Sequence, residues 1–414
     1  MFETKDIVVF LGQTDYDLRI SNYGRWIDQK CTPDVVSFIA ECVLSIDSES
    51  ISEGFSARDI WHSEFAGENT SSVFSKPDAG HIFTRNEYDK FFAQPLNMLA
   101  YSGVLKLEKS GNKNIYFVKD RAVLEYISLR ERNALAFISE YCTKVLKDSG
   151  IWTPFDSFFE KQDEGSFYIM KESFENFVTT NTAINGVVEV RRIFTKVLNP
   201  IANALGARGT VKGRLSRNPI TYAELMYNRE NFRDLSSSKP KDVTRLEWLE
   251  SRKEKSRTNY SAYQSQKAKR FLRRFNDVIR QGSSEVQDEY SHGLATQVHH
   301  IFPEHEYPEI SGVLENLIVL TPTQHMNMAH PRNNTHRIDL CYQKKLLHAK
   351  LNSIEENLSS ENEEPIYSFK EFAQVLNVGV GAEFDWNNIT SEAISDAIDS
   401  HFFNFDSSSL VTMN

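Results

Sequence analysis

A histidine pair, an asparagine and a third histidine lie within one short stretch toward the end of the sequence. The pair is His299 and His300, and Asn316 and His325 follow it. Seven of the 11 histidines fall between residues 292 and 336. Imidazoles bind divalent cations, and a neutral imidazole with a pKa of about 6.5 can take a proton from water. A bound cation and an activated water are what hydrolysis of a phosphodiester bond needs.

The residues around these side chains predict two strands. Residues 296–300 are β-prone and lead to a proline, which favours a strand that ends in a loop. Asn316 opens a second, apolar strand over residues 316–320. Adjacent residues on a strand point to opposite faces, so His299 and His300 can divide the two tasks. One would bind the cation while its neighbour faces the water.

A helix is predicted directly after the second strand. Thr321 is expected to be its N-cap, with Pro322 in the first helical position and Gln324 completing a Thr-x-x-Gln capping box. This arrangement puts His325 in the first turns of the helix. Two strands and a helix so close in sequence bring both members of the pair and His325 within reach of one point.

This segment resembles the HNH nuclease family. The ββα-metal motif of that family has Asp or His followed by His-x-x-Pro, then Asn-Leu-x-x-Leu, then a His five residues after the last Leu. The resemblance implies His300 as general base, His299 and His325 as metal ligands, and Asn316 as the residue that ties down the loop and orients the base. The matching residues are His299-His300-Ile301-Phe302-Pro303, Asn316-Leu317-Ile318-Val319-Leu320 and His325.

The resemblance also implies a divalent metal cofactor. Mg²⁺ is expected first, and Mn²⁺ or another divalent ion stays open because the first ligand is His299 rather than the commoner Asp. Many family members have Cys where Thr321 and Gln324 stand and build a structural zinc site there, so no such site is predicted here. His330 is left open as a third ligand. It lies about 140° round the helix from His325, at about 100° per residue.

A wider likeness covers residues 190–229 and 314–331, which look like parts of prokaryotic HNH restriction endonucleases. They are most similar to the type IIS enzymes, which bind a short asymmetric site and cut a fixed distance away. This implies a sequence-specific endonuclease for double-stranded DNA in a prokaryotic cell. Because one HNH centre cuts one strand, it also implies a homodimer, permanent or transient on DNA, or sequential nicking.

Other functions are compatible with the same residues. A non-catalytic DNA-binding regulator with a vestigial HNH fold would not require His299, His300, Asn316 and His325 to be intact together. A non-specific or modification-dependent HNH nuclease would keep the chemistry without the site specificity. The histidines could also be satisfied side chains of a structural motif.

The distribution of charge favours a polyanionic partner. The whole chain carries a net charge of −10, yet in residues 206–280 Lys and Arg outnumber Asp and Glu more than twofold. Such a concentration is typical of a nucleic-acid binder, although a solvated linker would have a similar composition. The residues predicted to contact DNA are Arg208, Lys212, Arg214 and Arg217, where glycines alternate with cations, and Arg191 and Arg192 on a helix predicted over 187–205.

Length and composition set wider limits. A chain of 414 residues, 40% of them hydrophobic, suits two or three globular domains and is not disordered. No apolar run approaches the roughly 20 residues that span a bilayer, and charges occupy the place of a signal peptide's apolar segment. The four cysteines are scattered, which argues against a disulfide framework. A cytoplasmic protein without a membrane partner is therefore expected.

The predicted fold class is α+β and multidomain, in three parts. Residues 1–130 would form an N-terminal winged-helix-like DNA-recognition domain. Residues 131–285 would form a helical and basic DNA-binding region, which includes an amphipathic helix over 259–281. Residues 286–414 would form the HNH nuclease domain with C-terminal helices.

The winged-helix expectation rests on a helix followed by a hairpin. The helix would begin at Thr84, with Glu87 closing a capping box, and the hairpin over 104–118 carries Lys106, Lys109 and Lys113. A strand over 7–10 and a helix over 33–45 would precede them. Any small α+β domain with a hairpin is an equally good interpretation of this order.

Overall fold

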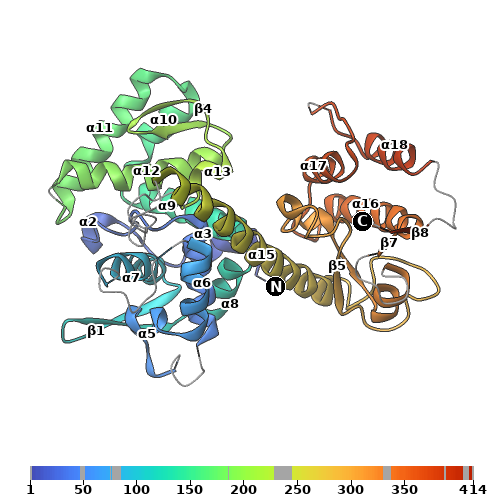
Figure 1. The fold of residues 1–414 in the computed structure, drawn as a ribbon. Coiled ribbons are helices and arrows are strands. Elements are labelled where there is room, and N and C mark those ends of the chain that lie inside the picture. The colour runs from blue at the N-terminus through green and yellow to red at the C-terminus, as the bar shows by residue number, and fades with distance from the viewer. Residues whose placement is uncertain are drawn as a thin grey trace. The chain divides into compact units, whose positions relative to one another are not determined.

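The computed structural model describes residues 2–46, 52–74, 76, 85–184, 186–227, 245–329, 337–386, 388–403 and 410–412. These residues form a mixed α/β structure that is mostly helical, with small two-stranded antiparallel sheets. They divide into two compact units, Met1–Lys253 and Glu254–Asn414 (Figure 1). None of the helices in this described part is long and apolar enough to cross a membrane.

The first unit is built around a buried helix, α3. Pro33 occupies the first turn of α3, whose residues are almost all shielded from solvent, and the helix packs against α7, α8 and α9. The elements of this half are α1 Thr4–Leu11, α2 Leu18–Ser21, α3 Pro33–Ser45, α5 Ala57–Trp61, α6 Glu64–Phe74, α7 Arg85–Tyr101, β1 Leu105–Ser110, β2 Lys113–Val118, α8 Arg121–Leu129 and α9 Glu131–Asp148.

The strand predicted over residues 7–10 is wrong, because this segment lies in helix α1. Ile7 and Leu11, one helical turn apart, are buried, whereas Val8 and Val9 are 59% and 69% exposed. Burial therefore follows the helical period and overrides the β-propensity of the valines. Asp6 also closes a capping box at the start of the helix.

The predicted helix and hairpin before residue 118 are confirmed. In the β1–β2 pair, Ser110 lies opposite Lys113, and Phe55 forms an isolated antiparallel bridge with Tyr116. The chain therefore runs from α3 through Phe55 to α5, α6, α7 and the hairpin. The predicted N-cap, Thr84, lies outside the described residues.

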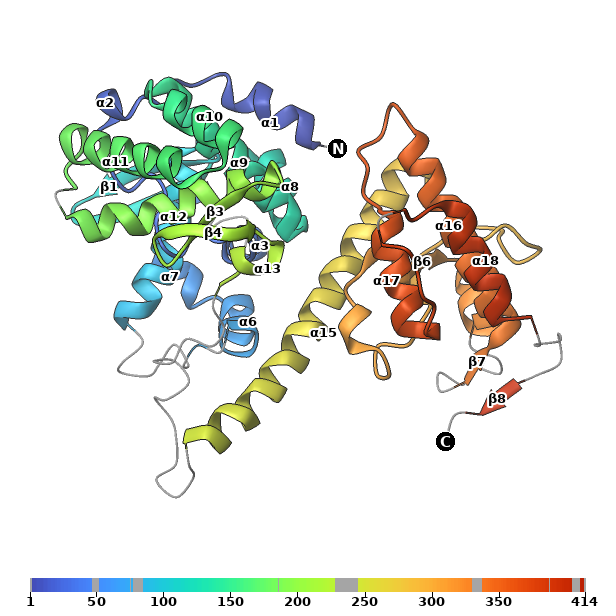
Figure 2. The ribbon, with the colours of Figure 1, turned by 90° about the horizontal axis from the view of Figure 1, so that it is seen from above.

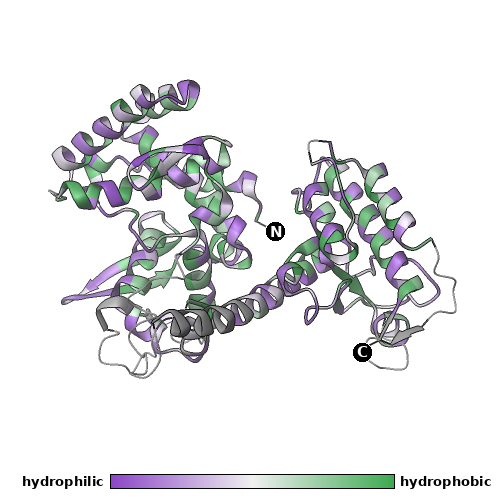
Figure 3. Ribbon diagram, turned by 45° about the horizontal axis from the view of Figure 1, so that its top comes forward, coloured by the Kyte–Doolittle hydropathy of each residue, from purple (hydrophilic) through white to green (hydrophobic). Residues whose placement is uncertain are grey.

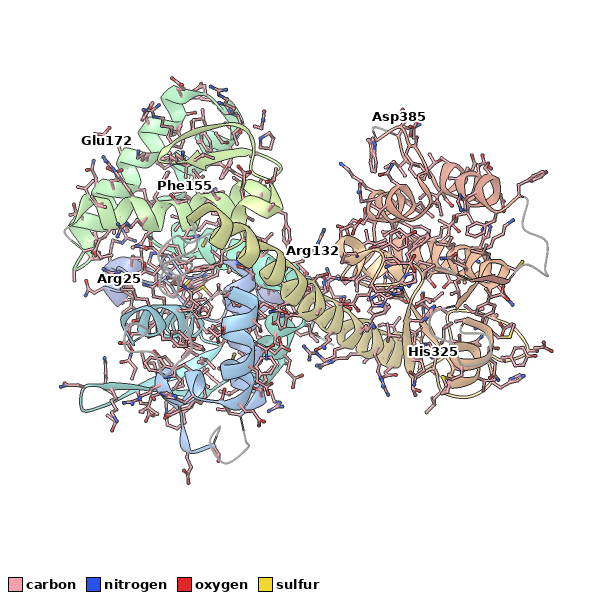
Figure 4. The ribbon with its side chains drawn as sticks, in the orientation of Figure 1. Arg25, Arg132, Phe155, Glu172, His325 and Asp385 are labelled. Atoms are coloured by element: carbon pink, nitrogen blue, oxygen red, sulfur yellow. The ribbon has the colours of Figure 1, made fainter. Side chains whose placement is uncertain are left out.

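The rest of the first unit is an aromatic-cored helical layer with a second hairpin. Phe155, labelled in Figure 4, packs against Phe174 and Phe194 from two other helices. The predicted helix over 187–205 is confirmed as α12, with Pro200 inside it. The elements are α10 Trp152–Lys161, α11 Glu164–Asn181, α12 Val187–Ala204, β3 Arg208–Val211, β4 Arg214–Pro219 and α13 Tyr222–Leu225.

The second unit surrounds the short sheet β5–β6. Strand β6 is buried along its whole length, and its residues are hydrophobic (Figure 3). Helices α16, α17 and α18 pack together beside it (Figure 2). The elements are α15 Arg245–Ile279, β5 Gln297–His300, η1 Pro308–Ile310, η2 Leu314–Asn316, β6 Leu317–Leu320, the π-helix η3 Gln324–Ala329, β7 Arg337–Asp339, α16 Leu340–Ser359, α17 Phe369–Val380, α18 Ser391–His401 and β8 Leu410–Thr412.

The two units differ from the three predicted parts. The boundary expected at 130/131 falls where α3 packs on both α8 and α9, so the residues on either side share one unit. The boundary expected at 285/286 is replaced by one at Lys253 and Glu254, inside α15. Most of α15 belongs with the second unit because Ser261 and Ser265 bond residues around β5.

Candidate active site

The two predicted metal ligands are brought together by the β5–β6 pair. His299 lies opposite Ile318 in the antiparallel register, and the chain then turns at Thr321 into η3, which carries His325. The ring centres of His299 and His325 are 5.2 Å apart, with the ring planes at 78°. Both side chains are half-buried, and His325 is labelled in Figure 4.

The spacing of these two rings fits a shared divalent cation. A cation about 2.1 Å from a nitrogen of each of two imidazoles holds the ring centres within roughly 5–6 Å of each other. Within the described ranges, no group of three or more His, Cys, Asp or Glu side chains is placed to hold a metal ion. Of the predicted metal ligands, His299 and His325 lie side by side, and His330 lies outside the described residues.

The neighbouring ring, His300, is buried and held by hydrogen bonds. Its Nε2 lies 2.9 Å from the carbonyl oxygen of Ser311 and 3.2 Å from Oγ of Ser265. A carbonyl oxygen can only accept, so Nε2 carries the proton and Nδ1 keeps its lone pair. Ser265 in turn donates to Oε2 of Glu304 at 3.1 Å, and His300 Nδ1 lies 4.0 Å from the same oxygen.

Burial keeps the His300 ring uncharged. Burial, and after it the positive charge of Lys269, lower the pKa of His300 to about 4. The Ser311 carbonyl and the Glu304 carboxylate oppose this shift. At neutral pH the ring is therefore a neutral imidazole with a free acceptor nitrogen, which is the form that a general base requires.

Asn316 is fully buried and pins the loop that follows β5. Its Oδ1 accepts from the backbone N–H of Phe302 at 2.8 Å, and its Nδ2 donates to the carbonyl of Phe302 at 3.0 Å and to that of Ile310 at 3.3 Å. These bonds cross the loop between Phe302 and Ile310, which leads to Ser311. Asn316 is the last residue of η2, one position before β6 begins.

The predicted capping box at the start of the helix is confirmed. Thr321 N–H donates to Gln324 Oε1 at 3.1 Å, and Gln324 N–H donates to Thr321 Oγ1 at 3.2 Å. The same Gln324 side chain also accepts from Ser284 Oγ at 2.6 Å and donates to Asp288 Oδ1 at 2.8 Å. This buried network ties the segment before β5 to the residue next to His325.

The basic residues predicted to contact DNA differ in their availability. Arg208 is used inside the fold, where it donates to the carbonyls of Ser216 and Gln162. Arg191 pairs with Glu175, with 2.8 Å between Nε and Oε1. The other four predicted side chains are exposed: Arg192, Lys212, Arg214 and Arg217.

Three of those exposed cations lie on the β3–β4 hairpin, whose backbone is hydrogen-bonded to side chains of neighbouring helices. Lys212 and Gly213 form the turn between β3 and β4, both with positive φ angles of 51° and 77°, and Lys171 donates to the Gly213 carbonyl. Asn199 bonds both the N–H and the carbonyl of Thr210, at 2.8 and 2.9 Å. The segment in which glycines alternate with cations is therefore a two-stranded β-ribbon that hydrogen bonds hold to the rest of the first unit.

Some residues that contact or influence His300 are not predictable from the sequence motif. Ser265 and Lys269 on α15, Glu304 in the loop and the carbonyl of Ser311 all act on His300. In the sequence, the four-residue spacing of Ser265 and Lys269 on a predicted amphipathic helix indicates only that the two side chains share one face of that helix. That spacing does not reveal which strand the helix face meets.

In comparisons with protein-family models, with curated proteins and with solved structures, nothing matches this chain.

Proposed function

We propose that this chain is a metal-dependent endonuclease for double-stranded DNA, with an HNH-type centre built from His299, His300, Asn316 and His325. One observation carries the proposal. A neutral imidazole, His300, with its Nε2 proton fixed by the Ser311 carbonyl, is the chain neighbour of one of two imidazoles spaced to share a cation. This combination supplies a proton acceptor and a cation-binding point at the end of one strand.

The residues would work as follows. His300 Nδ1 accepts a proton from the attacking water as its oxygen bonds to phosphorus. The bond from phosphorus to the 3′ oxygen breaks and that oxygen takes a proton from solvent, so the products carry a 5′-phosphate and a 3′-hydroxyl. A divalent cation bound by His299 and His325 would supply positive charge that stabilises the phosphorane and the leaving oxygen. Asn316 keeps the loop fixed, so that the Ser311 carbonyl holds the His300 tautomer.

The choice of cation follows from the donor atoms. Two imidazole nitrogens suit Mn²⁺, Co²⁺, Ni²⁺ or Zn²⁺ better than Mg²⁺, which prefers oxygen ligands. Mg²⁺ could be bound with the help of water and phosphate oxygens, as in many phosphoryl-transfer sites. We therefore expect activity with Mg²⁺ and higher activity with Mn²⁺ at equal concentration.

Features of the first unit support a DNA substrate with a defined sequence. The β3–β4 ribbon presents Lys212, Arg214 and Arg217, and a two-stranded ribbon fits the major groove of B-DNA. The order α3, Phe55, α5, α6, α7 and hairpin, with an isolated bridge between Phe55 and Tyr116, supports the proposal of a winged helix. Both features favour a restriction-type enzyme, acting in the cytoplasm of a prokaryotic cell as a dimer or by sequential nicking.

The test is digestion of unmethylated and methylated plasmid with the purified chain in Mg²⁺, in Mn²⁺ and in EDTA. Discrete fragments whose ends map at a fixed distance from one sequence would support the proposal. A smear, or cutting of methylated plasmid only, would indicate a non-specific or modification-dependent nuclease. Intact plasmid in both metals, with DNA binding retained, would indicate a regulator and contradict the nuclease assignment.

A further inference from the structure

One face of α15 runs along the candidate site. Ser261, Ser265, Lys269 and Arg273 recur at every fourth position, so they form a stripe on one side of the helix. Ser261 Oγ bonds the carbonyl of Pro308 at 2.6 Å. At the other end, Arg273 donates to the carbonyl of Thr296 at 3.2 Å, just before β5 begins.

The stripe places Lys269 beside His300. Ser265, one turn earlier, bonds the His300 ring, and Arg273, one turn later, bonds the residue before β5. Lys269 therefore lies along β5 between these two contacts. In line with this position, Lys269 lowers the pKa of His300, and the Glu304 carboxylate raises the pKa of Lys269.

A half-buried lysine at this position calls for an explanation. Burial lowers the pKa of Lys269, and the Glu304 carboxylate opposes that shift. The nearby Lys267 has a plain structural role, since it is buried and its Nζ lies 3.4 Å from the hydroxyl of Tyr263. Lys269 is only half-buried, so its ammonium group can still meet an anion at the site.

We propose that Lys269 binds a phosphate of the DNA strand being cut, next to the phosphodiester bond attacked by the water that His300 activates. This inference rests on the proposed nuclease function and names a residue outside the motif. Lysine holds phosphate as a compact point charge with three donors. The two imidazoles at the cation-binding point carry no charge when they bind a metal, so the protein's own positive charge at the phosphate would come from α15. Glu304 balances Lys269 until DNA arrives.

The experiment compares the full-length chain with Lys269→Met, which keeps the stem, and with Lys269→Arg, which keeps the charge. Lys344→Met is the control, because Lys344 is a partly exposed lysine of the same unit that pairs with Asp399 at 2.8 Å. Duplex binding is measured in Ca²⁺ over a range of salt concentrations, and single-turnover cleavage is measured in Mn²⁺. Thermal unfolding of each variant checks that the fold is intact.

For Lys269→Met we expect the slope of log K against log salt to become less steep by about 0.9, the value for one lost phosphate contact. We also expect at least a tenfold fall in the single-turnover rate. Lys269→Arg should restore the slope and part of the rate, and Lys344→Met should change neither.

An unchanged slope and rate in folded Lys269→Met would overturn the inference. A changed rate with an unchanged slope would also overturn it, because it would mean that Lys269 acts on the protein alone. If the unmodified chain binds DNA but does not cut it, the nuclease proposal fails, while the salt slope still decides whether Lys269 contacts a phosphate.

Discussion

The Nε2 atom of His300 lies 2.9 Å from the carbonyl oxygen of Ser311, and this contact fixes which nitrogen carries the proton. The loop that brings Ser311 to the ring is held by the buried amide of Asn316. The asparagine thus acts on the histidine through the backbone of the loop. This relationship gives the predicted role of Asn316, orienting the base, a physical route.

Removing the Asn316 amide should loosen that loop. In Asn316→Ala the N–H and carbonyl of Phe302 lose their partners inside the core, and each unsatisfied buried group costs about 1–3 kcal/mol. We expect a free energy of unfolding lower by a few kcal/mol in urea titrations. Asn362→Ala, at an exposed position, is the control and should change it little. Equal stability of the two variants would contradict the account of the loop.

Replacing either His299 or His325 should abolish tight cation binding. His299→Ala or His325→Ala leaves a single nitrogen ligand, so we expect the affinity for Mn²⁺, measured by titration with electron paramagnetic resonance detection, to fall at least tenfold. The double variant should bind hardly more weakly than either single one. His305→Ala is the control, since that exposed ring pairs with Glu306. Additive losses would show that the two rings bind separate ions.

Two arginines near the β3–β4 ribbon should respond in opposite ways. Arg217→Ala removes an exposed cation, and loss of a bidentate guanine contact would weaken DNA binding by about 1–3 kcal/mol without changing stability. Arg208→Ala removes bonds to the carbonyls of Ser216 and Gln162 and should lower stability. Fluorescence anisotropy and thermal unfolding measure the two effects. A stable Arg208→Ala protein with the larger binding defect would reverse the assignment.

Glu315, next to Asn316 in the chain, should make stability fall as pH rises. Burial, then the charge of Glu371, raise the pKa of this carboxyl to about 7, while a hydrogen bond from the Ser368 N–H and the charge of Lys350 oppose the rise. A carboxyl with a folded-state pKa above its unfolded value stabilises the fold at low pH, and that contribution is lost between about pH 4.5 and 7.

The matching variant is Glu315→Gln, which cannot ionise. Between pH 4.5 and 7.5, the urea midpoint of the unmodified chain should decline relative to that of the variant, and Glu361→Gln, at an exposed position, should follow the unmodified chain. Parallel curves for the unmodified chain and Glu315→Gln would show that the carboxyl does not titrate in this range.

The sequence predicted those parts of the site that depend on neighbours in the chain. The strand before His300, the strand after Asn316 and the capping box at Thr321 follow from local propensity and hydrogen-bonding chemistry, and the structure confirms them. Helix α12 and the hairpin β1–β2 were predictable for the same reason.

What the sequence did not predict depends on contacts between distant residues. Ser265 bonds the ring of His300 because α15 packs along β5, and no local pattern fixes that packing. Arg208 has the same sequence context as its exposed neighbours, but Gln162, directly after α10, holds it. In α1, the choice between strand and helix was decided by what Ile7 meets in the core.

His300 is proposed to take the proton from the attacking water. The most direct measurement is single-turnover cleavage of a DNA duplex in Mn²⁺ by the unmodified chain and by His300→Ala, with duplex binding measured in Ca²⁺. We expect the rate to fall at least a hundredfold, in line with the roughly 10²–10⁴-fold contribution of general-base catalysis, while DNA affinity and Mn²⁺ binding are kept. Undiminished cleavage by His300→Ala would contradict the account.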